Sequence, residues 1–374
     1  MKRAFLLALS LHGASCDSLW DAYLSQPPPC GAGTTACATG DLAQPADAAR
    51  PPVPDLAAPP AVCRSSAECS SASDWCNPRT QACEPLPTLR SVYLPDSNTV
   101  WAVGDKGLIL KLADATNAAS TWQPMERLTT AQLNSVHGLG AGDIWAVGAD
   151  STVLGYNGTS WSAVQTPEPG LELRAVYSAL AGSTIRRRIV ATSGARWFLN
   201  GTGTQWQKDT TQLGNPALYG LTIPVVVGAF KTWAVGLGGA LLTEDAGGWA
   251  AESSMTTADL YAACTDTSAV WAVGRQGVIR RILLLGSWMG TSSGTTQDLR
   301  SIHGSSGSNV WTVGDANTVL RYNGTAWSAN GCSFRPSNFL GVYVTSTSSV
   351  WVVGEQGSVC FWDGARWSDR SLRP

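Results

Sequence analysis

The stretch that decides the fold is Leu299 to Trp327, LRSIHGSSGSNVWTVGDANTVLRYNGTAW. Its pattern predicts four short strands: the alternating Leu299–His303, the apolar Val310–Val313, the β-branched and aromatic Thr318–Tyr322, and a last strand around the closing tryptophan. Asn323-Gly324 is a strong signal for a two-residue hairpin turn before that last strand. The stretch therefore contains one complete four-stranded unit.

The same unit recurs along most of the chain. Aligned on the tryptophan of the second strand, the copies place that position at Trp101, Trp145, Arg188, Trp233, Trp271, Trp311 and Trp351. The first strands begin at Leu89, Leu133, Leu173, Leu218, Leu260, Leu299 and Phe339, and a second tryptophan closes the copies at Trp122, Trp161, Trp206, Trp249, Trp288, Trp327 and Trp367. Repeats of about 40 residues with four strands each predict an all-β, seven-bladed β-propeller over residues 89–374.

The second strand favours blades over a flat sheet or a sandwich. In the sequence Val-Trp-Ala-Val-Gly at 100–104 the apolar residues are consecutive rather than alternate, which predicts burial on both faces. Neighbouring blades would supply that cover without helices. Because every copy contains its own four strands, we expect the ring to close between the first and seventh copies with no exchanged strand.

The repeats resemble known propellers in two respects. The turns beginning at Asn157, Asn323 and Asp363, each ending in Gly-x-x-Trp, are similar to a truncated Asp-box, which marks the same turn in sialidase-like propellers. The tandem Trp-Ala-Val-Gly pattern resembles the propellers of predicted bacterial lipoproteins and of photosystem assembly factors. The resemblance implies a fold and no activity, since an Asp-box is a structural motif.

The N-terminal region predicts export. Lys2 and Arg3 precede an apolar run too short to span a bilayer, so residues 1–15 are a predicted signal peptide. Gly-Ala-Ser-Cys at 13–16 is similar to a lipobox, so we expect lipidation of Cys16 and a membrane-anchored lipoprotein of the periplasm or cell surface. Cleavage nearby without lipidation, giving a secreted protein, is the alternative. Residues 16–62 are a predicted Pro/Ala-rich tether.

Ten cysteines in an exported chain predict disulfides. A small disulfide-rich module is expected at residues 63–84, and its connectivity is open because four cysteines allow several pairings. Zinc is less favoured there, since no C-x2-C pair is present. We expect Cys332 and Cys360 to be bonded and to staple the last blade, and Cys264 to be buried and unpaired. The module and tether cysteines are Cys63, Cys69, Cys76 and Cys83, with Cys30 and Cys37 spaced to close a loop of their own.

Two groups of residues are candidates for ligand contact. The first shares the fifth position of the first strand, where polar-tipped packing wedges are the favoured interpretation and ring tips near the central channel are the alternative. Its members are Tyr93, His137, Tyr177, His303 and Tyr343. The second group, Arg186 and Arg187, precedes Arg188 in a dense basic run, for which a solvated bulge in an eroded blade is the favoured interpretation and ligand contact the alternative. Arg280 stands where other copies carry leucine, and the sequence does not explain it.

The composition and the motifs limit the classes of function that the chain can have. A charged fraction of 14% and a net charge of −2 do not predict binding to nucleic acid. No nucleophile elbow, phosphate loop, H-E-x-x-H or EF-hand motif is present. No cofactor is predicted. The sequence favours a monomeric, non-catalytic propeller that binds a protein or a glycan through the face carrying the variable loops between blades, with membrane contact only through the lipid. The alternative is a carbohydrate-active hydrolase or lyase, which needs two carboxylates roughly 5–10 Å apart in a cleft.

Overall fold

The computed structural model describes residues 63–165, 168–181, 184–201, 205–223, 231–266, 268–283 and 286–372. The predicted signal peptide and tether, with Cys16, Cys30 and Cys37, lie outside the described residues. The chain divides into two compact units, residues 1–57 and 58–374, of which only the second contains described residues. Among these, no helix has the length and apolarity needed to cross a membrane.

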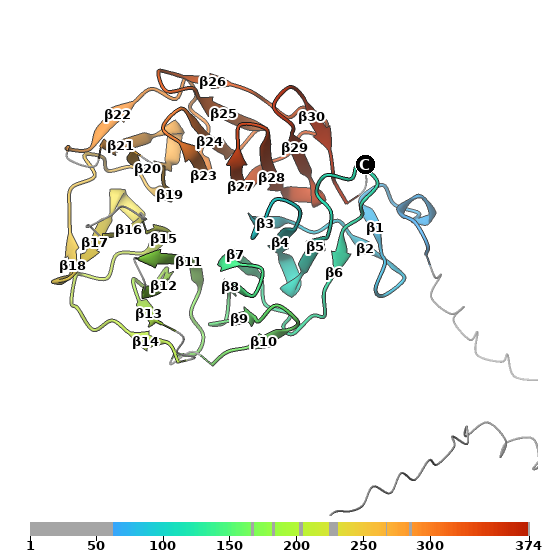
Figure 1. The fold of residues 1–374 in the computed structure, drawn as a ribbon, viewed down its shortest axis with the longest axis horizontal. Helices are drawn as coiled ribbons and strands as arrows, with labels where there is room; N and C mark the ends of the chain where they lie inside the picture. The colour runs from blue at the N-terminus through green and yellow to red at the C-terminus, as the bar shows by residue number, and fades with distance from the viewer. Residues whose placement is uncertain are drawn as a thin grey trace, which may run out of the picture. The chain divides into compact units, whose positions relative to one another are not determined.

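The second unit contains a seven-bladed β-propeller, which confirms the predicted fold. Seven four-stranded antiparallel sheets, each made of consecutive strands, surround a central axis (Figure 1). Each innermost strand contacts the innermost strand of the next blade, and the last of them, β27, contacts the first, β3. The ring therefore closes between the seventh and first blades, and each of these two sheets is built only from its own consecutive strands.

The strands of each blade follow one another outward from the central channel in chain order. The first blade consists of β3 (Leu89–Tyr93), β4 (Val100–Gly104), β5 (Ile109–Leu112) and β6 (Gln123–Pro124). The second consists of β7 (Leu133–Gly140), β8 (Asp143–Gly148), β9 (Val153–Tyr156) and β10 (Trp161–Ala163). The third consists of β11 (Leu173–Ala181), β12 (Thr184–Ala191), β13 (Arg196–Asn200) and β14 (Gln207–Lys208).

The remaining blades repeat this order. The fourth consists of β15 (Leu218–Thr222), β16 (Thr232–Gly236), β17 (Leu241–Asp245) and β18 (Gly248–Ala251). The fifth consists of β19 (Leu260–Thr265), β20 (Ala269–Gly274), β21 (Ile279–Leu283) and β22 (Met289–Thr291). The sixth consists of β23 (Leu299–Ser306), β24 (Asn309–Gly314), β25 (Thr318–Tyr322) and β26 (Trp327–Ala329), and the seventh of β27 (Phe339–Ser346), β28 (Ser349–Gly354), β29 (Val359–Trp362) and β30 (Trp367–Asp369).

Short 3-10 turns join the second and third strands of four blades. They are η2 (Asp105–Gly107), η3 (Leu237–Gly239), η4 (Arg275–Gly277) and η5 (Glu355–Gly357). The glycine that precedes each turn is needed for a close approach of two backbone segments. A Cβ on Gly104 would lie 2.0 Å from the carbonyl oxygen of Thr88. The Trp-x-Val-Gly pattern thus ends in glycine because the first strand begins directly against it.

Tryptophan pairs join the blades. The second-strand tryptophan of a blade packs edge-to-face against the closing tryptophan of the next, as Trp101 does against Trp161 with ring centroids 5.5 Å apart. Such aromatic pairs contribute about 0.5–1.5 kcal/mol beyond their area burial. The contact recurs in Trp145–Trp206, Trp233–Trp288, Trp271–Trp327, Trp311–Trp367 and, across the ring closure, Trp351–Trp122.

The basic run in the third blade corrects the expectation of a solvated bulge. Arg187 and Arg188 lie on β12 and are buried, with 5% and 3% of their surface exposed. Arg187 contacts Asp143 of the second blade, and Arg188 contacts Glu244 of the fourth. The ion pair of Arg188 lies at the interface of the third and fourth blades, the one interface where the second-strand tryptophan is missing. A buried salt bridge therefore replaces the tryptophan pair there.

The turn between the third and fourth strands also differs from its prediction. Tyr322 pairs with Trp327, so the connection is a four-residue loop rather than a two-residue hairpin. The side-chain oxygen of Asn323 accepts hydrogen bonds from the backbone N–H groups of Thr325 and Ala326 at 2.9 and 3.0 Å. Asp363 accepts the same two bonds in the last blade. The first residue of this loop therefore needs a side-chain oxygen that accepts the two backbone hydrogen bonds, and both Asn and Asp provide one.

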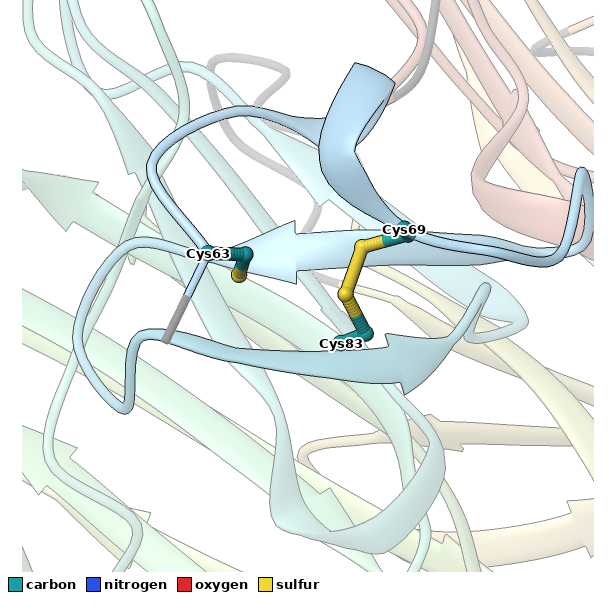
Figure 2. A group of neighbouring side chains, drawn as sticks. All are labelled: Cys63, Cys69 and Cys83. Atoms are coloured by element: carbon teal, nitrogen blue, oxygen red, sulfur yellow. A yellow bond between two sulfur atoms is a disulfide. The ribbon is translucent and has the colours of Figure 1, made fainter. Parts of the chain in front are cut away.

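The N-terminal cysteines form a small stapled module. It contains η1 (Ser66–Glu68) and the hairpin of β1 (Asp74–Asn77) and β2 (Ala82–Pro85). Disulfides join Cys63 to Cys76 and Cys69 to Cys83, with Cα–Cα distances of 5.7 and 5.6 Å. Figure 2 shows the sulfur atoms of three of these cysteines near one another, within 4.8 Å. Because all of them are in disulfides, none is a thiolate that could bind a metal.

The module is packed on the propeller at the ring closure. Trp75 of β1 is 3% exposed and shares a hydrophobic core with Leu112 and Trp122 of the first blade and with Leu372 near the C-terminus. In the last blade a disulfide joins Cys332, in the loop before β27, to Cys360 on β29, with a Cα–Cα distance of 6.4 Å. Cys264 is buried and free.

Candidate binding site at the channel mouth

Two layers of side chains line the central channel, which contains a cavity of about 150 Å³. The outer layer, which we call the mouth ring, comes from the second residue of each innermost strand. Its members are Arg90, Asn134, Arg174, Tyr219, Tyr261, Arg300 and Leu340. The inner layer, which we call the aromatic belt, comes from the fifth residue and comprises Tyr177, His137, Tyr93, Tyr343 and His303.

The aromatic belt runs along the channel wall over five consecutive blades. Its rings follow one another, with the His137 and Tyr177 centroids 4.0 Å apart and those of His303 and Tyr343 4.1 Å apart. Tyr93 joins the two pairs, lying 5.1 Å from His137 and 5.3 Å from Tyr343. The candidates at this position are thus brought together by the fold.

Burial keeps the belt uncharged. The Nδ1 atoms of His137 and His303 accept hydrogen bonds from the backbone N–H groups of Ser178 and Val344 at 3.1 and 3.2 Å. Burial, together with the proximity of His303, lowers the pKa of His137 to about 3, and burial lowers that of His303 to about 4. Burial also raises the phenol pKa of Tyr343. These groups act as packing wedges with satisfied hydrogen bonds rather than as acids or bases at neutral pH.

Four members of the mouth ring form a continuous cation–aromatic ladder. The Arg174 guanidinium lies 5.8 Å from the Tyr219 ring, and the Arg300 guanidinium lies 4.7 Å from the Tyr261 ring. The two tyrosine rings are 6.0 Å apart, so the ladder spans the third to sixth blades without interruption. All four side chains are half-buried, which leaves part of each accessible at the mouth.

Carboxylates hold the ladder in place. Arg300 donates two hydrogen bonds to Asp315, at 2.9 and 2.6 Å, and its pKa is raised mainly by this partner. Asp298 accepts a bond from the Tyr261 hydroxyl at 3.2 Å and contacts Arg300 at 3.3 Å. At the other end, Arg174 lies 3.6 Å from Glu172. The positive charges of Arg174 and Arg300 are therefore balanced by neighbouring carboxylates, so the mouth is polar and aromatic rather than strongly basic.

The mouth ring belongs to the face that carries the variable loops between blades. Arg90 binds Asp105 in the turn η2, which joins the second and third strands and lies on that face. Exposed large apolar side chains also occur in loops of this face: Leu128, Leu237, Met255 and Phe334. The bordering loops predicted to vary are Gln123–Gln132, Ala163–Glu172, Gln207–Ala217 and Ala329–Asn338.

Sequence reasoning missed the mouth ring. It selected the fifth position of the first strand, whose side chains lie in the belt, and the arginine run, in which Arg187 is buried and ion-paired and Arg186 is half-buried on β12. The second position carried a usable signal. It lies next to a leucine or phenylalanine that is fully buried in every copy, yet it varies among Arg, Asn, Tyr and Leu. A polar and aromatic position at a fixed place in a repeat indicates a surface rather than a core.

Two carboxylates do converge at the mouth, as the hydrolase alternative would require. Asp298 and Asp315 both contact the guanidinium of Arg300. Both contact the same nitrogen, Nη2, at 3.3 and 2.6 Å, so the two carboxylates are engaged by one cation, unlike the separate acid and base of a glycosidase. The arrangement stabilises the ladder and does not favour hydrolysis.

Comparisons with solved structures support the fold. One neighbour, described as YCF48 bound to D1 peptide, superposes with a TM-score of 0.61 and 20% identity, covering 74% of this chain and 94% of that one. YCF48 from Cyanidioschyzon merolae gives 0.58 and 17%, covering 75% and 97%. The WD40 propeller domain of Doa1 gives 0.60 and 11%, covering 75% and 93%. No family model and no curated protein matches the chain.

Proposed function

We propose that this chain is a non-catalytic propeller that binds a segment of a partner protein over the channel mouth. The observation that carries the proposal is the ladder of Arg174, Tyr219, Tyr261 and Arg300. Tyrosine and arginine are enriched among the residues that dominate protein-binding energy. Tyrosine brings a large contact area with little loss of side-chain entropy, and arginine brings a planar group with several hydrogen-bond donors. The neighbouring carboxylates fix the ladder before binding, which lowers the ordering cost on association.

The size of the channel cavity limits what can bind. At about 150 Å³ it is small for a peptide, so we expect a ligand to rest on the mouth ring instead of threading the propeller. Partly accessible aromatic and guanidinium groups on four consecutive blades suit an extended peptide, whose backbone and side chains can lie along them. A propeller of the same fold solved with a bound peptide supports this kind of ligand. Glycan binding and the monomeric state stay predictions.

Peptide selection tests the proposal. Short random peptides displayed on phage are selected on the wild-type protein and then measured on Tyr219→Ala/Tyr261→Ala. Loss of two hot-spot aromatics is expected to weaken binding by more than roughly thirtyfold, because one hot spot is worth on the order of 2 kcal/mol. The matched control is Leu180→Ala, an exposed apolar residue at the opposite end of β11. Equal loss in the control, or none in the tyrosine variant, would show that the mouth does not bind.

We also propose that the protein is exported and anchored through a lipid on Cys16. Three disulfides among the described residues support an oxidising compartment. The full chain should then partition with membranes, and Cys16→Ala should be released in soluble form. A substituted protein that stays with the membrane fraction would contradict lipidation at this residue.

A further inference from the structure

The fifth blade departs from the repeat on its outer half. In four other blades, one position of the third strand is a leucine that is at most 6% exposed: Leu110, Leu154, Leu242 and Leu320. In the fifth blade it is Arg280 on β21, which is half-buried. The residue opposite it on β22 is Gly290, where the second, fourth and sixth blades have alanine.

Arginine and glycine at these positions fit each other. The Nη1 atom of Arg280 lies 2.9 Å from the place that a Cβ on Gly290 would take. The guanidinium therefore lies over the glycine, and a larger residue would displace it. Beside the pair is a hollow of about 750 Å³, lined by residues 276–280 and 290–296. Apart from the arginine, the lining is made of glycine, serine, threonine, glutamine and two aliphatic residues, with no carboxylate.

The charge of Arg280 has no counterion among the described residues. Its Nη2 donates to the backbone carbonyl of Met255, and its Nε–H is buried without an acceptor. In contrast, Arg90, Arg188 and Arg300 each contact a carboxylate. A half-buried guanidinium without an anion is unfavourable, because it has lost part of its hydration without gaining an ionic partner. The hollow is thus complementary to a carboxylate.

An exposed apolar side chain lies beside the arginine. Met255, whose carbonyl accepts a hydrogen bond from Arg280, is 64% exposed. Methionine and arginine are both enriched at protein interfaces. A small free anion would make no use of the exposed methionine.

We propose that the hollow on the fifth blade is a second docking surface, which accepts an aspartate or glutamate side chain flanked by apolar residues on a partner protein. Arg280 supplies the anchoring charge, the hydroxyl groups of the 291–296 segment supply further donors, and Met255 packs against a flanking residue. The inference does not depend on the mouth ring, since none of these residues belongs to it.

Two phage libraries that differ only in a fixed central residue, Glu in one and Gln in the other, test the proposal. On the wild-type protein the Glu library should be retained about tenfold better, the ratio expected for a modest charge-assisted hydrogen bond. Arg280→Leu, which restores the residue of the other blades, should abolish the difference, and Gly290→Ala should reduce it. Arg79→Leu, which removes an exposed arginine of the cysteine module, is the matched control and should leave the difference unchanged.

The outcomes separate this surface from the mouth ring. Tyr219→Ala/Tyr261→Ala should keep the preference for Glu, whatever it does to total binding. No preference for Glu on the wild-type protein, or one that survives Arg280→Leu, would overturn the proposal. Arg280-dependent binding of inorganic phosphate in place of the Glu peptides would equally contradict a carboxylate-bearing partner.

Discussion

Arg188 and Glu244 form a two-bonded ion pair across the interface of the third and fourth blades, with Nε–Oε2 and Nη2–Oε1 both at 2.6 Å. The side chains are 4% and 14% exposed. Thr232 donates a further bond to the same carboxylate at 2.8 Å. The other six interfaces have a tryptophan pair at this place, so this is the one interface where an ion pair takes the position of the tryptophan pair.

Removal of one partner of this pair should destabilise the propeller strongly. Arg188→Leu leaves the Glu244 carboxylate buried without its counterion, which typically costs about 3–5 kcal/mol. Chemical unfolding followed by tryptophan fluorescence measures the effect. The double variant Arg188→Leu/Glu244→Leu is the control, and it should recover most of the loss because no charge remains buried. A double variant as unstable as the single one would show that the pair is not coupled.

This interface also shows which features of the propeller could be predicted from the sequence and which could not. The repeat period, the buried second strand and the closing tryptophans identified the blades because each copy carries its own local pattern. The role of Arg188 was hidden because its partner, Glu244, is 56 residues away, on the third strand of the next blade. The same holds for the mouth ring, whose ladder is visible only when Arg174, Tyr219, Tyr261 and Arg300 are placed around one axis.

The disulfide of the last blade should contribute measurably to stability. Cys332 and Cys360 are separated by 28 residues, for which the chain-entropy model gives about 3–4 kcal/mol. Cys332→Ala/Cys360→Ala should therefore unfold at lower denaturant concentration. Cys264→Ala, which alters the buried free cysteine, controls for loss of sulfur from the core. If alkylation of the unreduced, unfolded protein labels three cysteines of the propeller instead of one, the bond is absent.

Trp75 should stabilise the ring closure in particular. Its side chain joins the core that links the first blade to the C-terminal residues, and truncation of a buried tryptophan typically costs about 3–5 kcal/mol. In Trp75→Ala, hydrogen exchange should increase in β3–β6 and β28–β30. Exchange in β15–β18, on blades away from the closure, serves as the internal reference. Protection lost equally in all blades, or in none, would contradict a local role.

The buried histidines should make stability fall in acid. His137 and His303 have pKa values of about 3 and about 4 in the folded protein, against 6.5 in the unfolded chain. Below pH 6.5 the unfolded state binds more protons, so the free energy of unfolding decreases as the pH falls towards 4. His137→Asn/His303→Asn keeps an acceptor for the backbone N–H groups but does not titrate. Its stability should change less with pH over this range, and an unchanged pH dependence would argue against neutral buried imidazoles.

The most direct test of peptide binding at the mouth ring is a crystal structure of the propeller with a peptide obtained by the phage selection. The mouth-ring proposal predicts a peptide extended across the channel mouth, in contact with the rings of Tyr219 and Tyr261 and the guanidinium groups of Arg174 and Arg300. A peptide bound on the opposite face, at the turns that join the first and second strands, would contradict it.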